Sequence, residues 1–159
     1  MLTPTPETLH CELTERSAQP ALTIRTRTPV QALPALMGKA YGQIGQYLGR
    51  LGEHPVGASF AAYHNADMQD LDVEIGFQVA KPLPGQGEIT ASEIPAGKYA
   101  SCLHVGPYNA IGTTYNVLGQ WMTDNAYEAS GASYELYLND PQQTPPQELK
   151  TQVLFRLKA

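Results

Sequence analysis

The sequence predicts an α+β domain made of two copies of a strand-helix-strand-strand unit, with antiparallel sheet strands and helices packed on one face. Two segments, 33–51 and 108–125, carry apolar residues three and four positions apart, which is typical of a helix with one buried stripe. The segments around them alternate apolar and polar residues, as half-buried strands do. The third observation is an internal repeat, because similar segments recur in the same order after 74 or 78 residues.

The first copy contains four predicted strands and one predicted helix. The strands are expected at residues 11–16, 21–28, 58–64 and 71–80, and the helix at residues 33–51. The first two strands are close in sequence, and we expect them to form a hairpin around the turn at 17–20. Pro34 suits the first turn of the helix, and Gly52 is typical of a residue that ends one.

The second copy repeats this order after a segment rich in proline and glycine. Its strands are expected at residues 89–94, 99–105, 133–139 and 149–157, and its helix at about 108–125. Residues 60–65 match 134–139 at an offset of 74, and residues 71–79 match 149–157 at an offset of 78. We interpret this as a duplication within one domain, with a pseudo-twofold axis.

Composition excludes several classes of protein. The 159 residues contain 10 Lys and Arg against 15 Asp and Glu, for a net charge of −5, and the cations are scattered, so direct nucleic-acid binding is not expected. No apolar run approaches a membrane span and no secretion signal is present, which favours a cytoplasmic protein that does not insert into membranes. Cys11 and Cys102 form no metal-binding or disulfide motif, and we interpret both as small core residues. We expect no cofactor and no metal.

Strand alternation divides the side chains between two faces. Those expected to face the helices are Val73, Ile75, Phe77, Tyr134, Leu136, Leu138, Val153, Phe155 and Leu157. Those expected on the opposite face are Ala61, Tyr63, Asp72, Glu74, Glu135, Tyr137 and Asn139. Carboxylates among aromatic rings are typical of a site for an organic cation, because both the ring faces and the carboxylate attract positive charge.

Several motifs resemble one known family. They are Gly106-Pro107-Tyr108, the helix that carries Trp121, the segment 134–141 (YELYLNDP) and the segment 72–79 (DVEIGFQV). Together they resemble the GyrI-like small-molecule-binding domain, which also forms the effector-binding half of multidrug-responsive transcription activators. The resemblance implies tandem strand-helix-strand-strand (SHS2) modules with a ligand cleft between them. It places one domain over residues 1–159, with module one at about 11–80, a linker at about 81–87 and module two at about 88–158.

The resemblance also implies site residues. Glu135 corresponds to the buried acid that meets ligand cations, and Glu74 is expected to face the cleft from the other module. The aromatic residues expected to contact the ligand are Tyr63, Tyr115, Trp121 and Tyr137. Simpler interpretations stay open, since Glu135 could be a surface acid, both strand tyrosines could be ordinary sheet residues, and Trp121 lies on a helical stripe typical of core residues.

Three functions are compatible with these residues. The leading hypothesis is a stand-alone binding protein for hydrophobic, often cationic, aromatic small molecules, because few residues precede the first strand and a DNA-binding domain is not expected. The second is a hydrolase of small electrophiles with Glu135 and Glu74 as its acid–base pair. The third is a modulator of a protein partner such as DNA gyrase, suggested by the family name alone, and a homodimer is the other partner considered.

Overall fold

A computed structural model describes residues 10–158 of the chain. The chain divides into two compact units. Unit 1 comprises the residues up to Arg16 together with those from Gly97 onward, and unit 2 comprises Ser17–Ala96. Each unit is α+β, as the sequence predicts, with antiparallel strands and one long helix.

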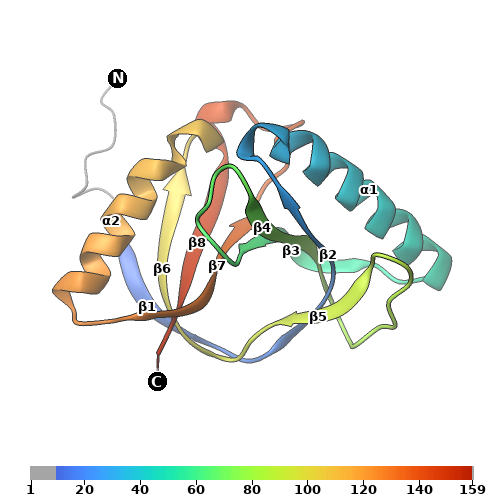
Figure 1. Cartoon of the computed structure of the whole chain (residues 1–159), viewed down its shortest axis with the longest axis horizontal. Coiled ribbons are helices and arrows are strands. Elements are labelled where there is room, and N and C mark those ends of the chain that lie inside the picture. The colour runs from blue at the N-terminus through green and yellow to red at the C-terminus, as the bar shows by residue number, and fades with distance from the viewer. Residues whose placement is uncertain (1–9, 159) are drawn as a thin grey trace. The chain divides into compact units, whose positions relative to one another are not determined.

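Unit 2 is a four-stranded antiparallel sheet with helix α1 packed on it (Figure 1). Its elements are β2 (Gln19–Thr28), the short 3₁₀ helix η2 (Val30–Ala32), α1 (Leu33–Leu51), β3 (Pro55–Tyr63), β4 (Leu71–Val79) and β5 (Thr90–Ile94). The strand order is β3-β4-β2-β5. Gly52 ends α1 in the left-handed conformation at a φ of 70°, which glycine adopts without strain, and this confirms the predicted end of the helix.

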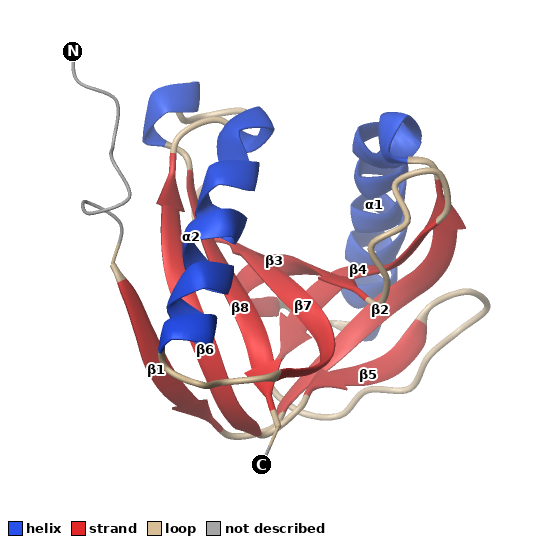
Figure 2. Ribbon diagram, turned by 60° about the vertical axis from the view of Figure 1, so that its left-hand side comes forward, coloured by secondary structure: helices blue, strands red, loops and turns tan. Residues whose placement is uncertain are grey.

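Unit 1 has the same kind of construction, with helix α2 lying along β6 and β8 (Figure 2). Its elements are β1 (Cys11–Arg16), β6 (Gly97–Val105), the 3₁₀ helix η3 (Tyr108–Ala110), α2 (Ile111–Asp124), β7 (Ala129–Tyr137), the 3₁₀ helix η4 (Pro146–Glu148) and β8 (Lys150–Leu157). The strand order is β1-β6-β8-β7.

The predicted hairpin between the first two strands is wrong. β1 pairs with β6, where Cys11 lies opposite Cys102, whereas β2 pairs with β4 and β5. Only Ser17 and Ala18 separate β1 from β2. A two-residue hairpin loop needs positive φ angles, and neither residue has one, so the chain continues from one unit into the other instead of turning back.

The strand registers confirm the internal repeat. Ala61 pairs with Ile75 in unit 2, and Glu135 pairs with Val153 in unit 1, which reproduces the two sequence offsets of 74 and 78. Both β3–β4 and β7–β8 also shift register at matching places, between Pro55 and Ser59 and between Ala129 and Ser133. The two copies therefore share the details of their pairing as well as the order of their elements.

The helices follow the repeat too. α1 buries Ala40, Ile44, Tyr47 and Leu48, and the residues 74 positions later are Thr114, Leu118, Trp121 and Met122. Of these, all but the half-buried Trp121 are fully buried on α2. Leu118 and Met122 pack in a core cluster with Ala100, Cys102, Val153 and Leu157. Residues of one unit can therefore be compared with their counterparts in the other.

The predicted sheet faces are right for β4 and β8 but wrong for β3 and β7. Phe77 contacts Tyr41 of α1 and Phe155 contacts Tyr115 of α2, so both phenylalanines face the helices as predicted. Glu135 and Tyr137, by contrast, lie opposite Val153 and Thr151 and therefore face α2.

The remaining errors follow from the same registers. Ala61 and Tyr63 lie opposite Ile75 and Val73 and face α1, whereas Tyr134 and Leu136 point to the face away from α2. Leu138 and Asn139 lie beyond the end of β7. The reason for the error is that the face away from α2 is also buried: Tyr134 is 6% exposed and Leu136 3%. When both faces of a strand are covered, apolar alternation does not identify the one that meets the helix.

Neither α1 nor α2 has the length and apolar character needed to cross a membrane, and the same holds for any other helix within residues 10–158.

Candidate functional site

Glu135 is a buried carboxylate held between helix and sheet in unit 1. It lies on β7, is 8% exposed, and faces α2. The Tyr115 hydroxyl donates a hydrogen bond to Oε2 at 2.5 Å, and the Tyr137 hydroxyl donates to Oε1 at 2.9 Å. The Tyr115 ring is itself held edge-on against Phe155, with centroids 5.8 Å apart. A single acid is therefore fixed by two tyrosines from two different elements.

The charge of Glu135 is not balanced by a basic side chain. Within residues 10–158, no lysine or arginine forms an ion pair with it. Burial raises the pKa of Glu135 above its ordinary value because the carboxylate loses its hydration. The two tyrosine hydrogen bonds and the charge of nearby His104 lower the pKa, but less than burial raises it. An incoming cation would favour the ionised form of this group.

Tyr108 places a third tyrosine ring at this acid. Its ring packs edge-on against Tyr137, with centroids 5.7 Å apart, and 37% of the residue is exposed. The negative charges of Asp140 and Glu135 raise the pKa of Tyr108, although burial is the larger cause, and this places its hydroxyl near both acids. We call Tyr108, Tyr115, Glu135 and Tyr137 the Glu135 site.

The Gly106-Pro107-Tyr108 motif explains how Tyr108 reaches this position. Gly106 has a φ of 135°, a conformation that favours glycine, and its amide donates to the Leu149 carbonyl at 2.8 Å. The turn leads directly into η3, which begins at Tyr108. Nε2 of His104 donates to the carbonyl of Pro107 at 2.9 Å, which ties the turn to β6. The motif therefore positions the exposed tyrosine of the site.

Polar groups continue from the Glu135 site into the interior. Nδ1 of His104 lies 2.8 Å from the Thr114 hydroxyl of α2, and both residues are buried. Because Nε2 donates to a carbonyl, Nδ1 of a neutral His104 accepts the bond from Thr114. Thr151 is fully buried between His104 and Tyr137 in the register, and its hydroxyl has no hydrogen-bond partner among the described residues.

Unit 2 shows that the fold does not require these polar residues. The counterpart of Glu135 is Ala61, the counterpart of Thr114 is Ala40, and the counterpart of Thr151 is Val73. Tyr41, the counterpart of Tyr115, donates instead to the carbonyl of Phe60 at 3.0 Å. The same packing forms with apolar residues, which indicates that the polar set of unit 1 serves a purpose other than folding.

Glu74 has different surroundings in unit 2. It lies on β4 and faces away from α1, as predicted. Its carboxylate accepts hydrogen bonds from Thr23 at 2.7 Å, Ser92 at 2.5 Å and His64 at 3.0 Å. Burial is the largest single influence and raises its pKa, but the three hydrogen bonds and the charge of His64 together outweigh it and leave the pKa lowered. Glu74 is thus a carboxylate saturated by protein donors.

The other predicted ligand residues lie on the helix-facing sides of their units. Trp121 packs against Tyr127, with ring centroids 5.5 Å apart, and against the core cluster under α2. Tyr63 is half-buried at the end of β3, opposite Val73. Their contacts with a ligand remain predictions, as does the pairing of Glu74 with Glu135, which belongs to the other unit.

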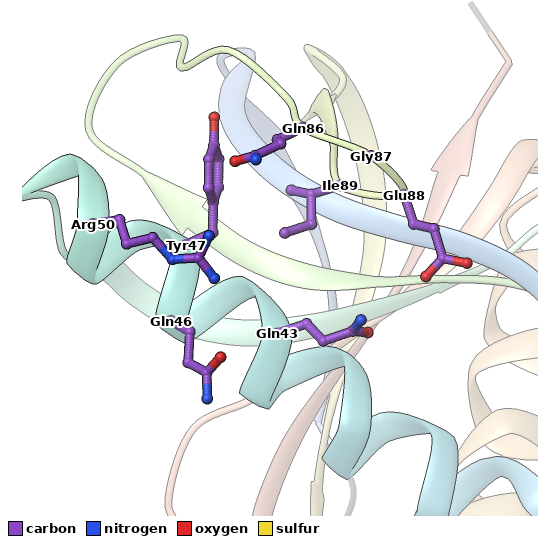
Figure 3. A pocket seen from close by; sticks show the side chains of 8 residues that line it. All are labelled: Gln43, Gln46, Tyr47, Arg50, Gln86, Gly87, Glu88 and Ile89. Carbon is purple, nitrogen blue, oxygen red and sulfur yellow. The ribbon is translucent and has the colours of Figure 1, made fainter.

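A hollow of about 370 Å³ lies elsewhere, in unit 2, between α1 and the segment 86–89. Figure 3 shows Gln43, Gln46 and Arg50 extending from the helix on one side and Glu88 on the other. Tyr47 stands in its wall, and its hydroxyl donates to the carbonyl of Pro84 at 2.6 Å. Its lining is dominated by amides and charged groups, so it lacks the acid enclosed by aromatic rings that distinguishes the Glu135 site.

Comparison with known proteins identifies the family. Residues 10–158 match the GyrI-like small molecule binding domain, so the chain belongs to this family and is a small-molecule-binding domain. No match was found among curated proteins. The resemblance inferred from the sequence motifs is thereby confirmed.

Solved structures share the fold. The C-terminal domain of EcmrR is 23% identical with a TM-score of 0.85, over 94% of this chain and 98% of that one. EcmrR in a complex with DNA is 24% identical with a TM-score of 0.83, over 94% of this chain, which spans only 57% of the EcmrR chain. SAV2435 bound to tetraphenylphosphonium is 10% identical (TM-score 0.68, 94% of each chain). A hydrolase encoded by lin2189 from Listeria innocua is 14% identical (TM-score 0.65, 93% of this chain and 91% of that one).

Sequence reasoning missed three residues around Glu135. Tyr108 was part of a recognised motif, but nothing in the sequence places its ring on Tyr137. His104 and Thr151 stand in otherwise apolar strands, and a polar residue at a helix-facing position is the signal that could have revealed them.

Proposed function

We propose that the chain binds hydrophobic organic cations at the Glu135 site. The tyrosine rings would stack on the apolar surface of the ligand, and the Glu135 carboxylate would neutralise its charge. The observation that carries this proposal is a buried carboxylate with two tyrosine donors and no basic partner within residues 10–158. Such a group is costly to ionise by itself, and a cationic ligand offsets that cost.

The comparison between the two units supports this interpretation. Unit 2 keeps the helix-facing tyrosines Tyr41 and Tyr63 but has Ala61 in place of the acid. Retaining a buried acid in only one copy is expected of a binding residue, because a residue needed for packing would be needed in both. The structurally similar SAV2435, which is bound to the lipophilic cation tetraphenylphosphonium, agrees with the proposed ligand class.

Isothermal titration calorimetry with tetraphenylphosphonium tests the proposal. Replacing Glu135 by Gln keeps the size of the side chain but removes its charge. We expect the dissociation constant to rise about 30-fold, which corresponds to about 2 kcal/mol for a buried charge pair. Glu15→Gln is the matched control, because it removes the same charge from an exposed position of unit 1. Equal affinities of E135Q and the parent protein would refute the role of Glu135.

A neutral aromatic ligand distinguishes charge recognition from simple apolar binding. Tetraphenylmethane derivatives made soluble by neutral substituents have a similar shape but no positive charge. We expect such a compound to bind the parent protein and E135Q with similar affinity. A large loss of affinity for the neutral compound in E135Q would mean that the substitution disrupts the site itself.

Hydrolysis of small electrophiles is the second candidate function. A carboxyl group with a raised pKa can hold a proton near neutral pH and act as a general acid, and Glu135 meets this condition. The fold is also similar to that of the lin2189 hydrolase. In this mechanism Glu135 would protonate the leaving oxygen, and Glu74 would accept a proton from the attacking water.

Product formation decides this second candidate. An aryl epoxide is incubated with the parent protein, with Glu74→Ala and with Glu135→Gln, and the diol is quantified by chromatography. Turnover by the parent that either substitution abolishes supports the mechanism. Diol formation no faster than in buffer, or turnover unaffected by either substitution, rejects it.

A further inference from the structure

The two cysteines of the chain face each other across neighbouring strands. Cys11 of β1 and Cys102 of β6 are direct partners in the antiparallel register, and their thiols are in hydrogen-bonding contact. Directly opposed residues have Cα atoms about 4.5–5.5 Å apart, and a disulfide requires about 4.4–6.8 Å. The backbone thus already holds the two thiols at a separation that a disulfide can bridge. Both cysteines are free in the structure.

The surroundings of the two thiols differ. Cys102 is 1% exposed and belongs to the core cluster beneath α2, whereas Cys11 is only partly buried and packs at the margin of that cluster. Burial, followed by the contact with Cys11, raises the pKa of Cys102 to about 12, so this thiol keeps its proton at neutral pH. A reagent from solvent therefore meets Cys11 first.

The core does not depend on a cysteine at this place. The counterpart of Cys102 in unit 2 is Ile24, which also lies in the middle of a strand triple and is buried. An aliphatic residue thus fills the same position in the other copy. Two cysteines in register, in a chain that has only two, need an explanation beyond packing.

We propose that Cys11 and Cys102 form a reversible disulfide when the protein meets a peroxide. Hydrogen peroxide first oxidises the Cys11 thiol to a sulfenic acid and is itself reduced to water. The Cys102 sulfur then attacks the Cys11 sulfur, the S–O bond breaks, and the hydroxyl leaves with the Cys102 proton as a second water. One peroxide is consumed for each disulfide, and two thiol equivalents restore the reduced pair.

The disulfide would fasten an edge strand. β1 has one neighbour in unit 1, β6, and lies at the end of the strand order β1-β6-β8-β7. Joining Cys11 to Cys102 closes a long covalent loop and restricts the unfolded chain, which stabilises the folded state. We expect the oxidised protein to unfold at a temperature several degrees above that of the reduced protein, and a thiol reductant to reverse the shift.

Mass spectrometry of the full-length protein tests the proposal. After exposure to a few equivalents of hydrogen peroxide, we expect the parent to lose two hydrogen atoms and both free thiols. Trypsin under non-reducing conditions should then yield the peptide that ends at Arg16 joined to the peptide 99–150. Dithiothreitol should separate the two peptides again.

Two variants keep the test decisive. Cys11→Ser leaves the core untouched, and we expect its Cys102 to stay reduced under the same exposure. Cys102→Ala should leave a Cys11 sulfenic acid that a cyclic dione traps. The proposal is overturned if the parent keeps both thiols, if Cys11 proceeds to sulfinic acid while Cys102 stays reduced, or if the disulfides formed join two chains.

Discussion

Replacing Glu135 by Gln should stabilise the protein at neutral pH, although it removes a side chain of the proposed binding site. The parent holds a carboxyl group that is 8% exposed and has a raised pKa. The amide is uncharged and nearly the same size. Its oxygen can accept the Tyr115 bond, and its NH₂ group can donate to the Tyr137 hydroxyl. The substitution therefore removes the cost of a buried charge and keeps the packing.

The pH dependence follows from the direction of the pKa shift. Because the folded-state pKa of Glu135 lies above the ordinary value of 4.5, the folded protein keeps a proton that the unfolded chain has released. The contribution of Glu135 to stability is complete below the unfolded pKa and declines as pH rises through the folded pKa. Over that interval the free energy of unfolding of the parent should fall, relative to E135Q, by up to about 1.4 kcal/mol per pH unit.

Urea denaturation measured at a series of pH values from acidic to neutral tests this prediction. The difference in unfolding free energy between E135Q and the parent should grow in favour of the variant as pH rises, and then level off. The control E15Q should follow the profile of the parent, because Glu15 is exposed. Parallel profiles for E135Q and the parent would refute the argument that Glu135 is buried without compensation.

Three further predictions concern single side chains. Tyr108→Ala should weaken tetraphenylphosphonium binding about fivefold, since an exposed cation–π contact contributes about 1 kcal/mol; titration calorimetry measures this, and an unchanged affinity would place the ligand elsewhere. Thr151→Val, which copies Val73 of unit 2, should raise the free energy of unfolding by about 1 kcal/mol because it removes a buried hydroxyl with no partner among the described residues; a loss of stability in urea would show that the hydroxyl is bonded. Glu74→Gln should destabilise the protein by about 1–3 kcal/mol at neutral pH. The pKa of Glu74 is lowered, so its contribution is present above the unfolded pKa and lost on acidification, and a pH-independent difference between E74Q and the parent would contradict this sign.

Local pattern was enough to predict most of the fold. The ends of α1, the order of the elements and the offsets of the repeat are properties of short segments, and the registers agree with them. The partner of β1 was not predictable in this way. Its pairing with β6 joins Cys11 to a residue far along the chain, and the apparent turn that suggested a hairpin lacks the backbone conformation that a hairpin needs.

The candidate site was predicted in its central residue but not in its geometry. The family motif pointed to Glu135 and Tyr137, and both lie in the site. The sequence pattern placed them on the face away from the helices, because Tyr134 and Leu136 look like the core side of β7. Both faces of β7 are buried, so only the register with β8 shows that Glu135 meets Tyr115 of α2.

The role of Glu135 is tested most directly by a crystal structure of the protein with tetraphenylphosphonium. The account predicts that the cation lies against the Tyr108 and Tyr137 rings, with the Glu135 carboxylate as the nearest acidic group. A cation seated instead in the hollow beside Gln43 and Arg50, with the Glu135 site unchanged, would contradict it.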